Sequence, residues 1–258
     1  MSNEDDKKVK KLLEDAHATG ALSKKSIDIL DVVDVGAQIQ AGLGVTIDDV
    51  AASEVVLVTM MPDDSSSIAS AGNTDAVRDG HNFVIDALRG SKQSGEVLAH
   101  TRFLNGFVLT PYCALDNAAK LDTQNYNPRL GTPLYDQACV VLGTVIAKAQ
   151  ELAQAGIAVR TVTLIITDGG DYGSTRCKPA DVKALVADML GQENHIVAAM
   201  GINDGTTDFK AVFRSMGIPD QWILTPGNSA SEIRRAFAVF SQSAVRASQG
   251  AQLGGFSN

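Results

Sequence analysis

The feature that most constrains the fold is a run of apolar residues that ends abruptly in carboxylates and hydroxyls. Residues 55–61 read VVLVTMM, and residues 62–67 read PDDSSS. Apolar side chains occupy both alternating faces of the run, so the pattern predicts a strand that is buried on both faces, as in a parallel sheet. The loop that follows lies at the carboxyl end of that strand and is dense in oxygen atoms that suit hard cations.

A second run of the same kind, residues 162–167, is followed by Asp168, two glycines and Asp171. Strand patterns alternate with helical patterns along the rest of the chain, which predicts an α/β fold: a doubly wound, mostly parallel sheet with helices on both faces. We expect strands at 55–61, 97–104, 107–109, 162–167, 195–202 and 222–224. We expect helices at 5–17, 76–89, 133–155, 179–190, 208–216 and from 229 onward, the last beginning with a capping box.

Three connections carry more specific predictions. Asn105-Gly106 separates two strand patterns and favours a hairpin with a type I′ turn. Residues 111–130 show no clear periodicity of apolar residues and are expected to form a long loop of the kind that is often functional. Thr132 fits the N-cap of the following helix, with Pro133 as its first residue. Capping and metal binding compete for the same Thr132 hydroxyl.

The loop after the first strand contains a candidate metal motif, D-x-S-x-S, formed by Asp63, Ser65 and Ser67. In an extended loop this spacing would point three side chains the same way. One carboxylate and two hydroxyls suit Mg²⁺, whereas zinc would favour His or Cys. The motif alone is short, so the hypothesis requires further ligands at the ends of neighbouring strands. Thr132 and Asp168 lie where a parallel sheet would bring them to the same edge.

The domain organisation is predicted from composition and from the residues that interrupt helical and strand patterns. Residues 1–52 contain weakly apolar helical segments and are interpreted as a helical extension that packs on the main domain; the alternative is a separate docking arm. Residues 53–246 hold the alternating strands and helices. Residues 247–258 are rich in glycine and serine and are expected to be mobile.

Composition narrows the classes of function. The net charge of −8 argues against a general nucleic-acid binder. No segment approaches the roughly 18–20 apolar residues of a membrane span, and the charged N-terminus lacks the apolar core of a signal peptide. Three widely spaced cysteines predict neither a disulfide framework nor a zinc site, so a reducing cytoplasm is expected. His81 and His195 are interpreted as a core and a strand-edge residue rather than ligands.

Taken together, these residues resemble a von Willebrand factor A (vWA) domain over residues 53–246. The metal-ion-dependent adhesion site of that family is a D-x-S-x-S motif followed by a Thr and then an Asp. The matching residues here are Asp63, Ser65, Ser67, Thr132 and Asp168. The resemblance implies a Rossmann-like sheet with Mg²⁺ or Mn²⁺ at its top. It implies that the three hydroxyls reach the ion directly or through water, that the two carboxylates act mostly through water, and that a partner's Glu or Asp fills the open position.

The resemblance also implies a function. Secreted adhesins of this fold carry a signal peptide, whereas intracellular bacterial members often work beside AAA+ ATPases of the MoxR type; the chain resembles the latter. We therefore expect a metal-dependent protein-interaction module that is not an enzyme. The alternatives are a structural or assembly subunit whose site is vacant or structural, and a Mg²⁺-dependent phosphatase or nuclease, which would need a nucleophile or base beside the ion. Asp64 and Asp171 are expected to tune the charge, to hold a second ion, or to form a solvated rim.

Overall fold

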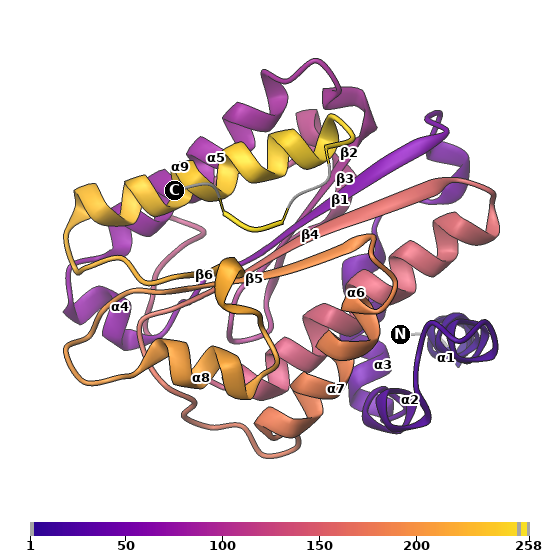
Figure 1. The fold of residues 1–258 in the computed structure, drawn as a ribbon, viewed down its shortest axis with the longest axis horizontal. Coiled ribbons are helices and arrows are strands. Elements are labelled where there is room, and N and C mark those ends of the chain that lie inside the picture. Colours follow the sequence, from indigo (N-terminus) through magenta and orange to yellow (C-terminus); the bar gives the residue numbers. More distant parts are fainter. Residues whose placement is uncertain (1–2, 252–253, 257–258) are drawn as a thin grey trace.

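A computed structural model describes residues 3–251 and 254–256 and shows a sheet flanked by helices (Figure 1). In the described residues the sheet has six strands in the order β3-β2-β1-β4-β5-β6, with every neighbouring pair parallel except β2 and β3. The predicted fold class, a Rossmann-like, doubly wound, mostly parallel sheet with helices on both faces, is confirmed. The strands are β1 Glu54–Met61, β2 Val97–Arg102, β3 Val108–Ala114, β4 Ala158–Thr167, β5 His195–Gly201 and β6 Ile223–Leu224.

The centre of the sheet is the pair β1 and β4. The two strands run parallel from Glu54, opposite Ala158, to Met61, opposite Ile165. Every residue of β1 after Glu54 is buried, as its two apolar faces predict. The strand order reverses between these two strands, because the chain adds β2 and β3 on one side of β1 and β4, β5 and β6 on the other. Their carboxyl ends therefore form the switch point at which open α/β sheets bind ligands.

Helices cover both faces of the sheet, as Figure 1 shows. Helices α5 (Thr74–Arg89) and α9 (Ala230–Ser248) pack against each other on one face. Their approach is close, since a Cβ atom on Gly80 would lie 2.0 Å from the ring of Phe237. Helices α6 (Leu134–Gln154), α7 (Pro179–Leu190) and α8 (Phe209–Ser215) lie on the other face.

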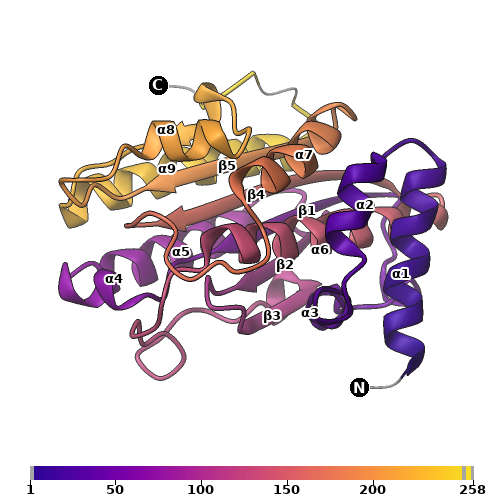
Figure 2. The same cartoon turned by 90° about the horizontal axis from the view of Figure 1, so that it is seen from below.

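The N-terminal helices α1 (Asn3–Ala18), α2 (Lys24–Leu30) and α3 (Val33–Leu43) form a layer that packs against α6 and α7, with α3 also lying beside β3 (Figure 2). Glu151 of α6 links this layer to the domain, because it pairs with Lys8 at 2.5 Å and with the fully buried Lys148 at 2.7 Å. Lys148 also donates to the carbonyl oxygen of Val45. A buried lysine needs such partners to remain charged, so these contacts fix the layer in place.

The end of the chain returns to the edge of the sheet. The sequence predicts a mobile tail at 247–258, of which residues 252–253 and 257–258 lie outside the described residues. The N–H of Phe256 donates to the carbonyl oxygen of Gln221 at 2.9 Å. The Phe256 ring also meets Trp222 edge-on, with ring centroids 5.1 Å apart. This segment therefore covers part of the edge beside β6.

Two local predictions are wrong. A type I′ turn needs positive φ at both central residues, but Asn105 is not among the positive-φ residues and Gly106 has φ of +97°. The turn instead closes through a hydrogen bond of 2.9 Å from Gly106 N–H to the oxygen of Phe103. Strand β3 also continues to Ala114, so the predicted loop at 111–130 begins only after this strand. Pairing with β2 extends β3 beyond what its weak sequence pattern indicates.

Three histidines are buried in the domain. His81 faces Thr101 at 2.9 Å, His195 faces Thr161 at 2.7 Å, and His100 meets the carbonyl oxygen of Thr110 at 2.7 Å. Burial lowers the pKa of His81 and His195 from 6.5 to about 4 and that of His100 to about 3. The native protein therefore holds these rings neutral at pH values where the unfolded chain protonates them.

We predict that acid destabilises the protein through these rings. Above pH 6.5 the rings are neutral in both the folded and the unfolded chain, and their burial does not reduce the free energy of unfolding. As the pH falls toward 4, only the unfolded chain takes up the proton, so the free energy of unfolding decreases. The variant His195→Asn should lack one such group. The difference in unfolding free energy between wild type and variant should shrink by about 3 kcal/mol between pH 6.5 and pH 4. A constant difference in urea titrations across this range would contradict a neutral buried His195.

We also predict that Leu142→Asp prevents folding. Leu142 is fully buried in α6, and an unpaired buried carboxylate costs about 3–5 kcal/mol in addition to the lost apolar contacts. That loss is comparable with the total stability of a domain. The matched control is Ala153→Asp, at an exposed position of the same helix, which should melt within a few degrees of wild type. Melting curves followed by circular dichroism provide the test.

Candidate metal centre

Asp63 is the residue around which the candidate site is built. It follows β1, its side chain is fully buried, and both of its oxygens are engaged. Oδ1 accepts a hydrogen bond from the backbone N–H of Ser65 at 2.7 Å. Oδ2 accepts from the hydroxyl of Thr167 at 2.7 Å and from the N–H of Asp168 at 3.4 Å. The Asp63 carboxylate therefore ties the loop after β1 to the end of β4.

The two motif serines lie at the start of a short helix rather than in an extended loop. Helix α4 (Ser66–Ser70) begins directly after Ser65, which has extended backbone angles. The helical turn brings the hydroxyls of Ser65 and Ser67 to 2.8 Å from each other. Ser67 donates in turn to Oδ1 of Asp168 at 2.5 Å. The hydroxyls of Ser65 and Ser67 therefore meet because of the first turn of a helix rather than because of an extended loop.

The spacing of these oxygens suits a small dication. Octahedral Mg²⁺ holds its ligands at about 2.0–2.1 Å, which places adjacent ligand oxygens about 2.9 Å apart. The oxygens of Ser65, Ser67 and Asp168 form a row with separations of 2.8 and 2.5 Å. Adjacent members of this row could therefore occupy neighbouring corners of an octahedron after only small movements.

Thr132 does not cap α6, contrary to the sequence prediction. The helix begins at Leu134 with Pro133 at the N-cap position. Its first N–H groups are satisfied by a distant loop: Tyr135 N–H donates to Asp171 Oδ1 at 3.2 Å and to the Ser174 hydroxyl at 3.1 Å. Because another segment supplies the cap, the Thr132 hydroxyl is not needed for it.

The backbone around Thr132 holds it at the same edge of the sheet. Leu130 forms a parallel bridge with Ser65, and Thr132 forms an antiparallel bridge with Tyr172. Thr132 is only 7% exposed. None of the hydrogen bonds among the described residues joins its hydroxyl to those of Ser65 and Ser67. The structure therefore connects Asp63, Ser65, Ser67 and Asp168 directly and places Thr132 beside them through its backbone.

The electrostatics of the site favour a cation. Burial raises the pKa of Asp63, and burial together with the neighbouring Asp63 raises the pKa of Asp64 and of Asp168 to about 6, against opposing hydrogen bonds. In the described part of the chain no Lys, Arg or His forms an ion pair with any of the three. Buried carboxylates without a counter-charge destabilise a protein, so a bound dication would relieve a real energetic cost.

The donor set is rich in hydroxyls rather than carboxylates. Within residues 3–251 and 254–256 no group of three or more His, Cys, Asp or Glu side chains is arranged to hold a metal ion. Asp63 uses its oxygens to hold the loops, which leaves Asp168 as the carboxylate aligned with the two serines. This composition excludes a zinc-type centre among these residues and is compatible with Mg²⁺ or Mn²⁺.

The two additional acidic residues have structural partners. Asp64 Oδ1 accepts from the N–H of Asn105 at 3.1 Å, and its backbone oxygen accepts from Arg129 and Leu130. Asp171 binds the first turn of α6. Each carboxylate therefore helps to hold a loop at the rim of the site, and a second ion is not required to explain either of them.

Sequence reasoning missed two residues near the site. Asp204 follows β5, and its charge contributes to the raised pKa of Asp168. Burial opposes the ionised form of Asp204, but hydrogen bonds from Thr207 and Thr206 lower its pKa to about 2. Tyr126, in the loop after β3, donates from its buried hydroxyl to the carbonyl oxygen of Asp63. Asp204 could have been found from the sequence, because it is an acidic residue that follows the predicted strand at 195–202. No local sequence pattern indicates that Tyr126 lies near the site.

We predict that Tyr126→Phe destabilises the protein by about 1–2 kcal/mol, because the carbonyl of Asp63 loses a buried donor. This corresponds to a fall of roughly 3–6 °C in Tm. The matched control is Tyr172→Phe, in which the same hydroxyl is removed from a side chain that is 81% exposed. Equal melting temperatures for the two variants would show that the Tyr126 hydroxyl does not support the site.

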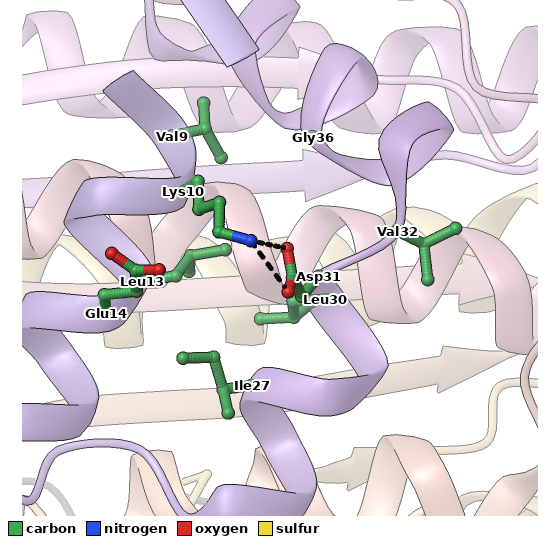
Figure 3. Close-up of a pocket in the computed structure, with 9 residues that line it drawn as sticks. All are labelled: Val9, Lys10, Leu13, Glu14, Ile27, Leu30, Asp31, Val32 and Gly36. Carbon is green, nitrogen blue, oxygen red and sulfur yellow. Dashed lines mark hydrogen bonds and ion pairs between the residues drawn. The ribbon is translucent and has the colours of Figure 1, made fainter. Parts of the chain in front are cut away.

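A separate apolar pocket of about 180 Å³ lies between the N-terminal helices (Figure 3). The ion pair between Lys10 and Asp31, at 3.0 Å, crosses it. The pocket belongs to α1, α2 and α3, whereas the metal-site residues follow β1 and β4. The pocket is lined by aliphatic side chains, by three charged side chains and by one glycine: Val9, Leu13, Ile27, Leu30, Val32, Lys10, Glu14, Asp31 and Gly36.

Comparisons with known proteins bear on the fold. No protein-family model matches the chain, and no curated protein matches it. No helix among the described residues is both long enough and apolar enough to span a membrane.

Several solved structures are similar. The pilus adhesin SpaC from Lactobacillus rhamnosus GG matches in its open conformation with a TM-score of 0.52 and 13% identity, over 75% of this chain and 30% of SpaC. A second crystal structure of SpaC gives a TM-score of 0.54 and 12% identity, over 75% of this chain and 31% of SpaC. The VWA domain of SpRpn10 matches with a TM-score of 0.46 and 9% identity, over 70% and 92%. The chain thus corresponds to about a third of SpaC, and at these identities the likeness concerns the fold alone.

Proposed function

We propose that this protein is a metal-dependent protein-interaction module. In this proposal Mg²⁺ or Mn²⁺ lies at the carboxyl ends of β1 and β4 and binds a Glu or Asp side chain of a partner protein. The observation that carries the proposal is the row of oxygens from Ser65, Ser67 and Asp168, set among buried carboxylates that form no ion pair with any basic residue in the described part of the chain. The resemblance of residues 53–246 to vWA domains supports an interaction role by analogy.

Each residue would have the role in metal binding that its contacts suggest. Ser65, Ser67 and Thr132 would offer neutral hydroxyl oxygens, and Asp168 would contribute negative charge directly or through water. Asp63 would hold the loops in place, since both of its oxygens already accept hydrogen bonds. Because the nearest donors are mostly neutral, a bound dication would keep positive charge and attract an external carboxylate.

The proposal assigns the site a binding role rather than catalysis. A Mg²⁺-dependent hydrolase would need a base beside the ion. The candidate bases His81, His100 and His195 are buried in the domain and hydrogen-bonded to threonines. Their lowered pKa values also make them weak bases at neutral pH.

A second candidate function is that of an assembly subunit that does not use the ion. One observation favours it: Ser65, Ser67 and Asp168 already satisfy one another through hydrogen bonds. In that case the polar cluster would only fasten the loops, and partners would bind elsewhere. Dependence on metal separates the two functions.

The partner and the setting are further parts of the proposal. The resemblance stated above makes an AAA+ ATPase of the MoxR type the first partner to test. A cytoplasmic setting would keep the three cysteines reduced. The similar SpaC protein is a pilus adhesin, so the fold itself is compatible with more than one setting.

We predict that Mg²⁺ stabilises the wild-type protein and that Ser67→Ala and Asp168→Ala abolish this effect. At 100 times its Kd the ion adds about 2.7 kcal/mol, or roughly 5–10 °C in Tm for a chain of this size. The matched control is Ser66→Ala, because Ser66 is exposed and lies beside Ser67 without joining the row of oxygens. Isothermal titration with Mg²⁺ gives the affinity directly.

The same variants test the function. A partner captured from the source cell's lysate by wild-type protein in Mg²⁺ should be lost in EDTA and lost with Asp168→Ala, but retained with Ser66→Ala. If Mg²⁺ binds and the partner is retained in all samples, the ion has no role in the interaction. If Mg²⁺ neither binds nor changes Tm, the assembly-subunit function replaces the proposal.

A further inference from the structure

A second polar cluster joins α6 to the loop that precedes α7. Asp136, in the first turn of α6, accepts three hydrogen bonds from backbone N–H groups of this loop. The donors are Thr175 at 2.9 Å, Arg176 at 3.0 Å and Cys177 at 2.6 Å. These contacts place the backbone of Cys177 directly over one face of α6.

That face also carries a cysteine. Cys139 lies three residues after Asp136, so the two side chains are neighbours on the helix surface. Cys139 is 1% exposed and Cys177 is 8% exposed. Because Asp136 fixes Cys177 against the helix turn from which Cys139 projects, the two thiols meet, and a hydrogen bond joins them.

The two thiols are chemically unequal. The hydrogen bond from Cys139 is the largest influence on the pKa of Cys177 and lowers it, with help from the charge of Arg176, whereas burial and the charges of Asp136 and Asp181 oppose this shift. The same hydrogen bond, with burial, raises the pKa of Cys139. Cys177 is therefore the thiol that more readily forms a thiolate, and the thiolate is the reactive form. Neither residue has a part in the candidate metal site.

We propose that Cys139 and Cys177 are a modification site that closes to a reversible disulfide when the protein meets hydrogen peroxide. The Cys177 thiolate attacks one oxygen of the peroxide, the O–O bond breaks, and Cys177 becomes a sulfenic acid as hydroxide leaves. The Cys139 thiol then attacks the Cys177 sulfur. An S–S bond forms, the S–O bond breaks, and the proton of Cys139 leaves with the oxygen as water. A small thiol reverses the reaction by exchange.

The loop can supply the movement that this bond requires. The sulfurs must approach to about 2.05 Å, and most residues of α6 are buried, so the movement falls to the loop. The loop between β4 and α7 contains Gly169, Gly170 and Gly173, with open space around each and φ of +117° at Gly173. Closing the bond would fasten this loop to α6, including Tyr172, whose backbone pairs with Thr132.

The test uses the full chain, treated with hydrogen peroxide and then alkylated and mapped by mass spectrometry. We expect a linked pair of peptides that contains Cys139 and Cys177, lighter by two hydrogen atoms and separated again by dithiothreitol. The oxidised protein should melt several degrees higher, because the link constrains the unfolded chain. Cys113→Ala is the matched control, since Cys113 lies in β3 and burial raises its pKa; it should form the same link.

The variant Cys139→Ala gives an independent readout. Without its partner, Cys177 should stop at the sulfenic acid and be trapped by dimedone, whereas wild type should give little of this adduct. The proposal is overturned if wild-type Cys177 proceeds to the sulfinic acid, if neither thiol reacts at peroxide concentrations that oxidise free cysteine, or if the recovered link contains Cys113. These measurements need no metal, so they stand whether or not the proposed function is correct.

Discussion

The candidate site depends on one buried carboxylate. Asp63 accepts hydrogen bonds from Ser65, Thr167 and Asp168, and it thereby joins the ends of the two central strands. Its charge has no basic partner among the described residues. A buried carboxylate of this kind is tolerated because N–H and O–H dipoles surround it. The same arrangement sets the serines and Asp168 in a row of oxygens whose spacing suits a small dication.

The start of α6 is the second constraint. Its first N–H groups are bound by Asp171 and Ser174, and Asp136 in its first turn binds the backbone before α7. One helix end thus organises the whole segment from β4 to α7. This arrangement frees the hydroxyl of Thr132 from capping and brings Cys177 against the helix. The proposed metal centre and the proposed thiol pair therefore share a scaffold, although their chemistry is separate.

Much of the fold could be predicted because its signals are local. The runs at 55–61 and 162–167 became the central strands β1 and β4, and the helix predicted at 179–190 coincides with α7. Weak or short sequence patterns did not predict their elements correctly. Helix α4 has only one turn, and β3 gains its length from pairing with β2. Elements that depend on a neighbour for their stability leave little trace in their own residues.

The sequence by itself determined the α/β class and the two central strands, because strand burial is a property of short segments, and its resemblance to vWA domains marked the five residues that we propose as ligands. Tertiary structure decided which groups these ligands meet. It gave the capping role at α6 to Asp171 rather than to Thr132, and it placed Tyr126 under Asp63 from a loop without any pattern. Such choices depend on which distant donors and acceptors come within about 3 Å of each other, and only the folded chain fixes those distances.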